Sequence, residues 1–325
     1  MIYCDTKSTD IYYNLACELY FASEKILPDD VFLMWRTSPT IVIGKYQNAL
    51  EEIDGAYVRE HGVTVARRLS GGGTVYMDMG GWQFSWITRT PDEEIDFARF
   101  VDPVAEVLRS YGADARLSGR NDITVGGRKI SGNAQYRLGE MTVHHGTLLF
   151  DTDLEAMALA TRPKAYKFTS KAIASVRERV VNIRSVLPPA YASLTAEEFR
   201  RAVVGRLTGE TVALTPEDEE RIRALSDERF RDERVIWAAS PRFEMEKDVR
   251  TEGGTFRVGL TVRKGRIEEA GIEGDFFGKP ETAEAMAAAL RGTEFTPNAV
   301  RQALAPFEAS LFRVTAEDLA RGIFE

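Results

Sequence analysis

The sequence has little cysteine and little histidine. Its 325 residues include two cysteines, Cys4 and Cys17, and three histidines. The cysteines form neither a CxxC nor a CxxH spacing, so we do not expect a structural zinc site. Two cysteines in a chain of this length favour a reducing compartment.

Long apolar runs and an excess of basic residues are absent as well. No apolar run approaches the length of a membrane span, and Asp5, Lys7 and Asp10 lie where a signal peptide needs its apolar core. The net charge of −8 argues against a nucleic-acid partner, because such a partner requires a dense basic surface. With 44% hydrophobic and 28% charged residues, the composition is typical of a soluble globular protein. We therefore expect a cytoplasmic protein with neither nucleic-acid nor membrane partners.

Apolar periodicity predicts a chain that contains both helices and strands. Helices are expected at residues 11–27, 97–111, 195–207 and 216–229. Strands are expected at residues 31–36, 40–47, 63–69, 73–78, 82–88 and 141–151, with a hairpin at 122–131. This order of elements predicts the α+β class.

The composition changes near residue 245. An alternating hairpin with a Lys264–Gly265 turn, a third strand and two helices follow this point. These elements are sufficient for a small core of their own. We therefore predict a catalytic domain at residues 1–245 and a small α+β accessory domain at residues 246–325.

Three consecutive glycines follow a predicted strand in ARRLSGGGTVYMD, which begins at Ala66. Glycine loses more backbone entropy on folding than any other residue, so the triplet requires a reason. Consecutive N–H groups without Cβ atoms can bind an anion, and Arg67 and Arg68 would add positive charge. The P-loop and dinucleotide patterns do not fit, because these glycines lead back into a strand. We predict a phosphate-binding loop of another type; a tight bend with solvated arginines is the simpler alternative.

The segment DITVGGRKIS predicts a hairpin, because Gly126–Gly127 suits a two-residue turn with positive φ. Alternation would then sort the side chains onto two faces. The polar face would carry Asp122, Thr124, Lys129 and Ser131. The other face would carry Ile123, Val125, Arg128 and Ile130. A lysine on the polar face could neutralise a phosphate or an oxyanion, although most hairpin lysines are simply exposed.

His144 and His145 are adjacent in a predicted strand and therefore point to opposite faces. They cannot both bind one metal ion, and His61 is the only other histidine. We do not expect a histidine metal site. One of the pair is expected to line a pocket or to donate a hydrogen bond.

Six stretches together resemble the lipoate–protein ligase family, whose relatives are the biotin–protein ligases. They are TIVIGKYQN, ARRLSGGGTVYMD, SGRNDI, GGRKISGNAQ, HHGTLLFDTDL and SVRERVVN, in the family's order within residues 40–182. The tail, with GDFFG, resembles the accessory domain of many such ligases. The resemblance implies a mixed-sheet catalytic domain of the biotin/lipoate ligase type. It also implies a two-step reaction, in which lipoate and ATP form lipoyl-AMP and a lysine of a lipoyl domain then accepts the lipoyl group.

The resemblance implies roles for individual residues. The residues that would bind ATP are Arg68, Gly73, Thr74, Val75, Tyr76 and Lys129. The residues that would bind lipoate are Gly72, Lys129 and His145. Lys129 would contact the lipoyl carbonyl and the α-phosphate as an electrostatic catalyst. Asp122 is the candidate Mg²⁺ ligand, because this hard cation prefers carboxylate oxygen near phosphates, and the basic segment 164–184 would close over the adenylate.

The implied partners are lipoyl domains of 2-oxoacid dehydrogenase E2 subunits, the glycine cleavage H protein, or both. The sequence departs from the family's usual pattern at Met77, where histidine is common, and at Gly81, where asparagine is common. One alternative is an octanoyl or lipoyl acyltransferase of the same fold, but its cysteine nucleophile has no counterpart after Cys17. Another is a catalytically weak carrier-binding homologue. A biotin ligase fits less well, because RRLSGGG does not alternate arginine and glycine.

Overall fold

The computed structural model describes residues 1–47, 49–90, 95–161, 175–236, 244–279 and 281–324. These residues form two compact units. The first comprises Met1–Ile43, Leu50–Arg68 and Thr74–Ile236. The second comprises Gly44–Ala49, Leu69–Gly73 and the described part of Trp237–Glu325. Two short segments from the N-terminal half therefore pack with the C-terminal part of the chain.

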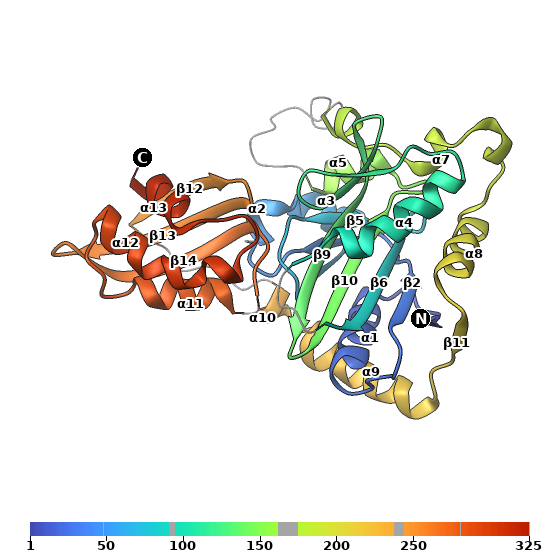
Figure 1. Cartoon of the computed structure of the whole chain (residues 1–325), viewed down its shortest axis with the longest axis horizontal. Helices are drawn as coiled ribbons and strands as arrows, with labels where there is room; N and C mark the ends of the chain where they lie inside the picture. Colours follow the sequence, from blue (N-terminus) through green and yellow to red (C-terminus); the bar gives the residue numbers. More distant parts are fainter. Residues whose placement is uncertain (48, 91–94, 162–174, 237–243, 280, 325) are drawn as a thin grey trace. The chain divides into compact units, whose positions relative to one another are not determined.

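A mixed sheet of eight strands forms the centre of the first unit (Figure 1). In spatial order its strands are β11 (Glu210–Val212), β1 (Ile2–Cys4), β2 (Val31–Trp35), β6 (Trp82–Arg89), β10 (Met141–Leu148), β9 (Arg128–Leu138), β8 (Asp122–Val125) and β7 (Arg116–Ser118). The neighbours β11, β1 and β2 run parallel, and the other pairs run antiparallel. The predicted α+β class with a mixed sheet is confirmed.

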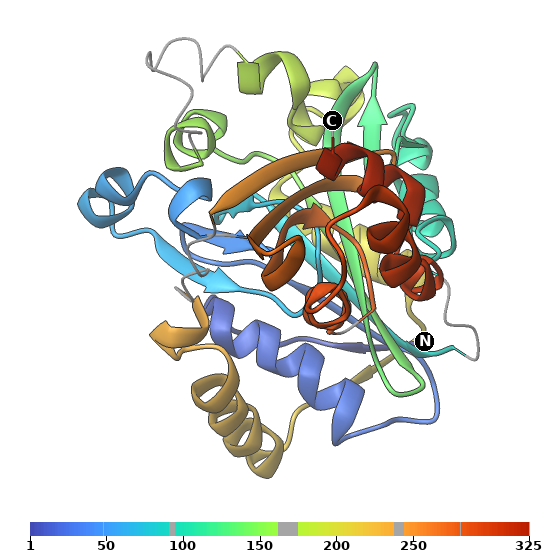
Figure 2. The same ribbon diagram turned by 90° about the vertical axis from the view of Figure 1, so that its left-hand side faces the viewer.

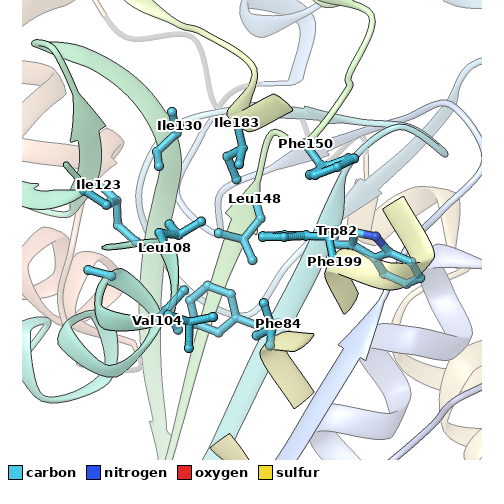
Figure 3. Close-up of a cluster of buried hydrophobic side chains, with 14 of the residues drawn as sticks. Trp82, Phe84, Val104, Leu108, Ile123, Ile130, Leu148, Phe150, Ile183 and Phe199 are labelled. Carbon is cyan, nitrogen blue, oxygen red and sulfur yellow. The ribbon is translucent and has the colours of Figure 1, made fainter. Parts of the chain in front are cut away.

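One face of this sheet is covered by α4 (Ala98–Ser110) and α8 (Ala196–Leu207). Figure 3 shows their side chains meeting the strands: Val104 from α4 and Phe199 from α8 lie near Phe84 and Leu148. Apolar residues recur along α4 at helical spacing and are buried on this side. Each such side chain contributes about 1.5–3 kcal/mol when it is fully buried.

The opposite face is covered by α1 (Ile11–Ser23), because Ser85, next to Phe84 on β6, contacts Glu18 of this helix. Helix α9 (Pro216–Arg229) packs against α1, and Figure 2 shows the blue α1 beside the gold α9. Helix α1 begins at the N-cap Asp10, whose side chain accepts a hydrogen bond from the Tyr12 amide. The two faces of the sheet are therefore covered by different helices, and α9 packs against α1.

A side-chain cluster joins α1 to α9. The carboxylate of Asp218 on α9 accepts a hydrogen bond from the Tyr20 hydroxyl at 2.6 Å and pairs with Lys25, which follows α1. Asp218 also completes the capping box of α9 with Thr215. One carboxylate thus caps its own helix and fastens the neighbouring one.

A smaller sheet in the first unit consists of β4 (Thr64–Arg67), β3 (Thr40–Ile43) and β5 (Val75–Met77). The Tyr12 hydroxyl of α1 donates a hydrogen bond to the Val65 carbonyl at 2.8 Å, which fastens this sheet to α1. The predicted strands 40–47 and 63–69 are too long at their C-terminal ends, because the chain there enters the second unit.

Short helices complete the N-terminal two thirds of the chain. They are α2 (Ala49–Glu52), α3 (Gly55–Glu60), α5 (Leu154–Ala160), α7 (Ile183–Val186), the 3₁₀ helix η1 (Pro189–Tyr191) and α10 (Glu233–Ile236). Within the ranges that the structure describes, no helix is long and apolar enough to cross a membrane.

The second unit is built on an antiparallel sheet of β12 (Met245–Thr251), β13 (Gly254–Arg263) and β14 (Arg266–Phe276). Its helices are α11 (Thr282–Leu290), α12 (Pro297–Leu304), the 3₁₀ helix η2 (Ala305–Ser310) and α13 (Ala316–Phe324). Their apolar side chains form a core that also includes Tyr46 from the N-terminal half. Lys264 and Gly265 both have positive φ, so the predicted turn is confirmed, whereas sequence analysis missed α13.

Candidate active site

Lys129 lies near the start of β9, opposite Thr124 of β8. Gly126 and Gly127 both have positive φ, so the predicted hairpin turn is confirmed. Lys129 Nζ lies 2.8 Å from Asp122 Oδ1, and each side chain is 34% exposed. The structure therefore brings together the predicted catalytic lysine and the predicted metal ligand.

The predicted placement of Ser131 on the polar face is wrong. A β-bulge shifts the register, so that Ile123 opposes Ser131 and Asp122 opposes Gly132. Ser131 therefore lies on the face of Ile123 and is fully buried, rather than on the face of the lysine. Strict alternation cannot predict this shift, because the extra residue of a bulge has no partner of its own and both Ile123 and Ile130 are needed in the core.

Gly132 makes room for the lysine ammonium group. A Cβ atom at this position would lie 2.7 Å from Lys129 Nζ and 2.8 Å from Lys129 Cε. The Gly132 amide donates a hydrogen bond to Thr147 Oγ1 of β10 at 3.0 Å, which fixes the backbone beneath the lysine. A larger residue would push Nζ away from Asp122.

His145 lies on the same face of the sheet as Asp122. Asp122 opposes Gly132, and two residues further along β9 Ala134 opposes His145 of β10. The His145 side chain is 10% exposed, and its Nδ1 lies 3.0 and 3.1 Å from the two carboxylate oxygens of Glu18. This face is therefore the one that α1 covers.

His144 points to the opposite face, as predicted for adjacent histidines in a strand. Its ring stacks on Phe100 of α4 with the centroids 4.7 Å apart, and its Nε2 lies 3.3 Å from Asn133 Oδ1. Burial holds the pKa of His144 well below its usual 6.5. Asn133 Nδ2 donates to the Asn121 carbonyl at 3.0 Å, and a Cβ atom at Gly146 would overlap Asn133 Oδ1. A neutral His144 thus supports the loop that precedes β8.

The two arginines before the glycines have different surroundings. Arg67 Nε donates to the Val235 carbonyl at 2.9 Å, and its Nη2 donates to the Ile236 carbonyl at 2.8 Å. Arg68 is buried, and its Nη1 donates to the Val42 carbonyl at 3.2 Å. Arg67 therefore fastens α10 to β4, which the sequence did not predict.

The other predicted ATP-binding residues of the first unit lie at the start of β5. Thr74 Oγ1 donates to Glu52 Oε2 at 2.9 Å, and Val75 pairs with β3. Tyr76 and Met77 are buried, and burial raises the pKa of the Tyr76 hydroxyl. The role of these residues toward ATP stays a prediction.

The glycine triplet belongs to the second unit, where it approaches the end of β14. The Gly72 amide donates to the Phe276 carbonyl at 2.8 Å, and a Cβ atom at Gly71 would overlap this carbonyl oxygen. A Cβ atom at Gly73 would lie 3.0 Å from Asp275 Oδ2. The close backbone approach of Phe276 therefore accounts for Gly71, the positive φ of Gly72 favours glycine, and Gly73 leaves space for the Asp275 carboxylate. The Gly72 N–H is bonded to the Phe276 carbonyl, so in this structure it does not offer the free donor that the predicted phosphate-binding loop requires.

The predicted basic closing loop lies partly outside the described residues, which omit 162–174. Its C-terminal end is described, and the Val181 amide donates to the Lys129 carbonyl at 2.9 Å. The backbone of Lys129 is therefore hydrogen-bonded to the C-terminal end of this segment.

Sequence analysis missed three polar residues around the site, namely Glu18, Ser85 and Asn133. A signal for Glu18 is present, since it is a lone carboxylate between Cys17 and Leu19 in a helix that is buried along nearly all of its length. Nothing in the local sequence marks Ser85 or Asn133, because their hydrogen-bond partners include residues of other segments of the chain.

A cavity of about 500 Å³ lies elsewhere in the first unit, beside α1 and α9. Asp10, Tyr13, Glu219 and Arg231 are among its lining residues, and it includes none of the predicted site residues. Its lining carries equal numbers of acidic and basic side chains, whereas the chemistry predicted from the sequence requires a net positive charge. We therefore place the candidate active site at Lys129 rather than at this cavity.

Comparison with known proteins identifies the family. Residues 10–208 match the family model described as Lipoyl protein ligase A/B catalytic domain, and residues 240–323 match Bacterial lipoate protein ligase C-terminus. The chain is 39% identical over 293 residues to lipoate-protein ligase LplJ of Bacillus subtilis, covering 87% of this chain and 88% of the relative. The chain belongs to the lipoate–protein ligase family. This ligase therefore attaches lipoate to protein, as the sequence motifs imply.

Further relatives agree with this assignment. The ligase is 36% identical over 337 residues to a lipoate–protein ligase of Streptococcus pyogenes, covering 97% of this chain and 96% of the relative. Its fold is similar to the crystal structure of P. falciparum LipL1 in complex with lipoate, with a TM-score of 0.74, 19% identity and 93% of each chain covered. The bipartite lipoate protein ligase of Thermoplasma acidophilum gives a TM-score of 0.66 at 25% identity, covering 75% of this chain and 98% of that chain.

Proposed function

We propose that this ligase uses ATP to convert lipoate into lipoyl-AMP and then transfers the lipoyl group to a lysine of a lipoyl domain, with Lys129 as the catalytic residue. The placement of Lys129 carries this proposal. The ammonium group is partly exposed, lies above a glycine and has Asp122 as its partner in the described structure. A phosphate or an oxyanion could replace that partner.

Lys129 would act electrostatically in both steps. In the first step a lipoate carboxylate oxygen attacks the α-phosphorus of ATP, the P–O bond to pyrophosphate breaks, and pyrophosphate leaves. In the second step the lysine amine of the carrier attacks the lipoyl carbonyl, the C–O bond to AMP breaks, and the amine loses a proton. Negative charge develops on phosphate or carbonyl oxygens each time, and a fixed ammonium group offsets it. Lys129 forms no covalent bond.

The remaining binding roles follow from the family motifs. We propose that Arg68 and the segment 73–76 bind ATP, and that Gly72 and His145 approach the lipoyl chain. Support for His145 comes from its position on the same sheet face as Asp122. Arg68 brings a buried guanidinium group, which would favour an anionic ligand.

Asp122 is the proposed Mg²⁺ ligand. Among the residues that the structure describes, no group of three or more His, Cys, Asp or Glu side chains is placed to hold a metal ion. A single carboxylate nevertheless fits Mg²⁺, which commonly takes one or two carboxylates and completes its shell with substrate phosphates and water. When bound there, the ion would neutralise phosphate charge. Asp122 would then hold the ion while Lys129 approaches the α-phosphate.

The proposed acceptors are lipoyl domains of 2-oxoacid dehydrogenase E2 subunits, the glycine cleavage H protein, or both, and the proposed location is the cytoplasm. Both cysteines are buried, and burial raises the pKa of Cys4 to about 12 and that of Cys17 well above its usual range. A thiolate nucleophile is therefore not available from either residue at neutral pH. This argues against the acyltransferase alternative.

Lipoate-dependent ATP–pyrophosphate exchange tests the proposal directly. The wild-type chain should show exchange, and Lys129→Ala should lower its rate by about 100- to 1,000-fold, the usual cost of removing one well-placed electrostatic contact. Arg128→Ala is the matched control, because Arg128 is the exposed neighbour in the hairpin. Wild-type chain that binds lipoyl domains without exchange would favour the carrier-binding alternative. Equal exchange rates in the wild type, Lys129→Ala and Arg128→Ala would show that Lys129 is not the catalytic residue.

A further inference from the structure

A buried polar network lies on the sheet face that carries the candidate site. Glu18 of α1 is 1% exposed, and its carboxylate accepts a hydrogen bond from Ser85 Oγ at 2.6 Å. The same carboxylate lies 3.0 and 3.1 Å from His145 Nδ1. A buried carboxylate is strongly unfavourable unless donors or a positive charge compensate it, so these contacts offset the cost of burying Glu18.

The network has a fixed direction. Trp35 Nε1 donates to Ser85 Oγ at 2.9 Å, and an indole nitrogen can only donate. Ser85 therefore places its own proton toward Glu18, and Glu18 acts as an acceptor. This leaves Nδ1 of His145 as the second donor to the carboxylate. The tautomer of the imidazole is thus set by Glu18.

The network lies along the same strands as Lys129. Ala134 of β9 opposes His145, which in turn opposes Ser85 of β6. Two residues before Ala134 comes Gly132, beneath the lysine ammonium group. On this face of β9, the residues between Lys129 and the position of His145 are therefore small, namely Gly132 and Ala134. An extended acyl chain with its carboxylate at Lys129 would run toward His145.

We propose that Glu18 is a positioning residue for the acyl substrate: it holds His145 with a proton on Nδ1 and in a fixed orientation beside the hydrocarbon part of lipoate. This inference rests on the proposed function of Lys129 and His145. Glu18 acts through the histidine and does not take part in either chemical step. Its loss should therefore weaken acyl binding while leaving the chemistry at the phosphate unchanged.

The tautomer can be observed directly, because the chain has only three histidines. Protein labelled with ¹⁵N-histidine gives three sets of ring signals by NMR, and His145→Gln assigns one of them. Wild-type His145 should carry its proton on Nδ1. In Glu18→Gln the neutral amide no longer enforces this form, and the signal should move toward the Nε2-protonated tautomer. His61 and His144 serve as internal references. A wild-type His145 protonated only on Nε2 would overturn the proposal without any variant.

Binding and kinetics measure the consequence. For Glu18→Gln we expect the Kd for lipoate, measured by calorimetry without ATP, and the KM for lipoate to rise about tenfold. The kcat and the KM for ATP should change less than twofold. Tyr20→Phe is the matched control on the same helix, because Tyr20 binds Asp218 and not the network. It should lower stability without a change in the His145 signal or in the KM for lipoate.

The outcomes separate this inference from the proposed function. A wild-type chain that neither binds lipoate nor catalyses exchange contradicts the proposed function, whatever the NMR signals show. Active wild type together with a Glu18→Gln variant of unchanged lipoate affinity contradicts the inference alone. A Glu18→Gln variant that loses kcat and stability in parallel would also contradict the inference, because a residue with a purely structural role gives that result.

Discussion

Two glycines allow polar side chains to occupy both faces of the β9–β10 strand pair. Gly132 leaves space for the Lys129 ammonium group on the face covered by α1. Gly146 leaves space for Asn133 on the face covered by α4. The same short strands thus carry a catalytic candidate on one side and its supporting hydrogen bonds on the other.

His144 should make the stability of the protein depend on pH. Burial lowers the pKa of this histidine below the 6.5 expected in the unfolded chain. Below about pH 6.5 the unfolded chain therefore binds a proton that the folded chain does not, so stability falls as the pH falls, by up to ~1.4 kcal/mol per pH unit. His144→Gln keeps a donor for Asn133 but does not titrate. We expect it to flatten the dependence between pH 6.5 and 5, as measured by urea unfolding.

His61→Gln is the control for this prediction. His61 is exposed and stacks on Tyr57, so this variant replaces a histidine without changing the core. A His144→Gln protein with the wild-type slope would show that another group titrates on unfolding.

At the scale of elements, the joint between α1 and α9 depends on one carboxylate. Burial alone would raise the pKa of Asp218, but the hydrogen bonds from Lys25 and Tyr20 outweigh this effect and lower the pKa to about 2. The folded-state pKa is depressed, so the contribution of Asp218 to stability is complete above the unfolded value of about 3.9 and is lost as the pH falls toward 2. This joint holds the helix that carries Glu18.

Asp218→Asn should lower the free energy of unfolding at pH 7 by about 2 kcal/mol, because hydrogen bonds to a charged acceptor are lost together with the cap. The difference from wild type should shrink as the pH falls from about 4 to 2, which chemical denaturation at several pH values can measure. Asp227→Asn changes an exposed carboxylate on the same helix and should have little effect. Equal losses in the two variants would refute a special role for Asp218.

Elements with regular periodicity could be predicted from the sequence, whereas irregular features could not. The apolar spacing of α4 and the Gly126–Gly127 turn correctly predicted their structures. The bulge that places Asp122 opposite Gly132 is invisible to alternation, because it depends on which isoleucines the core accepts. Lys129 and Asp122 were nevertheless predicted on one face. Glu18 was missed because its partners, Ser85 and His145, are 67 and 127 residues away.

At the scale of the whole molecule, two segments next to family motifs pack with the C-terminal unit. In Gly44–Ala49, Tyr46 stacks on Phe276 with the ring centroids 4.6 Å apart, and its carbonyl accepts the Gly274 amide at 2.7 Å. In Leu69–Gly73, Gly72 bonds to the Phe276 carbonyl. Sequence analysis could not predict this packing, because it assigns residues to domains by their order along the chain, whereas these two segments contact residues more than 200 positions away.

A chain that ends at residue 245 should therefore lose adenylation before transfer. Without Phe276, Tyr46 and Gly72 lose their partners, and alignment of ATP with lipoate requires ordered loops. We expect activity from lipoate plus ATP to fall at least about tenfold more than transfer from supplied lipoyl-AMP, a difference of ~1.4 kcal/mol in activation free energy. Both half-reactions are measured on the same preparation. Full-length Asp248→Asn, which alters only an exposed ion pair, is the control. Equal losses in both half-reactions would assign the unit to carrier binding or to general stability.

The hydrogen bond between Gly72 and Phe276 also determines when the glycine segment can fold during translation. The two residues are 204 positions apart (276 − 72), and translation adds roughly 5–20 residues per second, so Gly72 emerges about 10–40 s before its partner exists. During that interval the sheets of the first unit can already pair, while the glycine segment has no β14 on which to fold. We therefore expect a nascent chain to gain its lipoate-activating ability only near the end of translation, which would limit premature use of ATP by incomplete polypeptides.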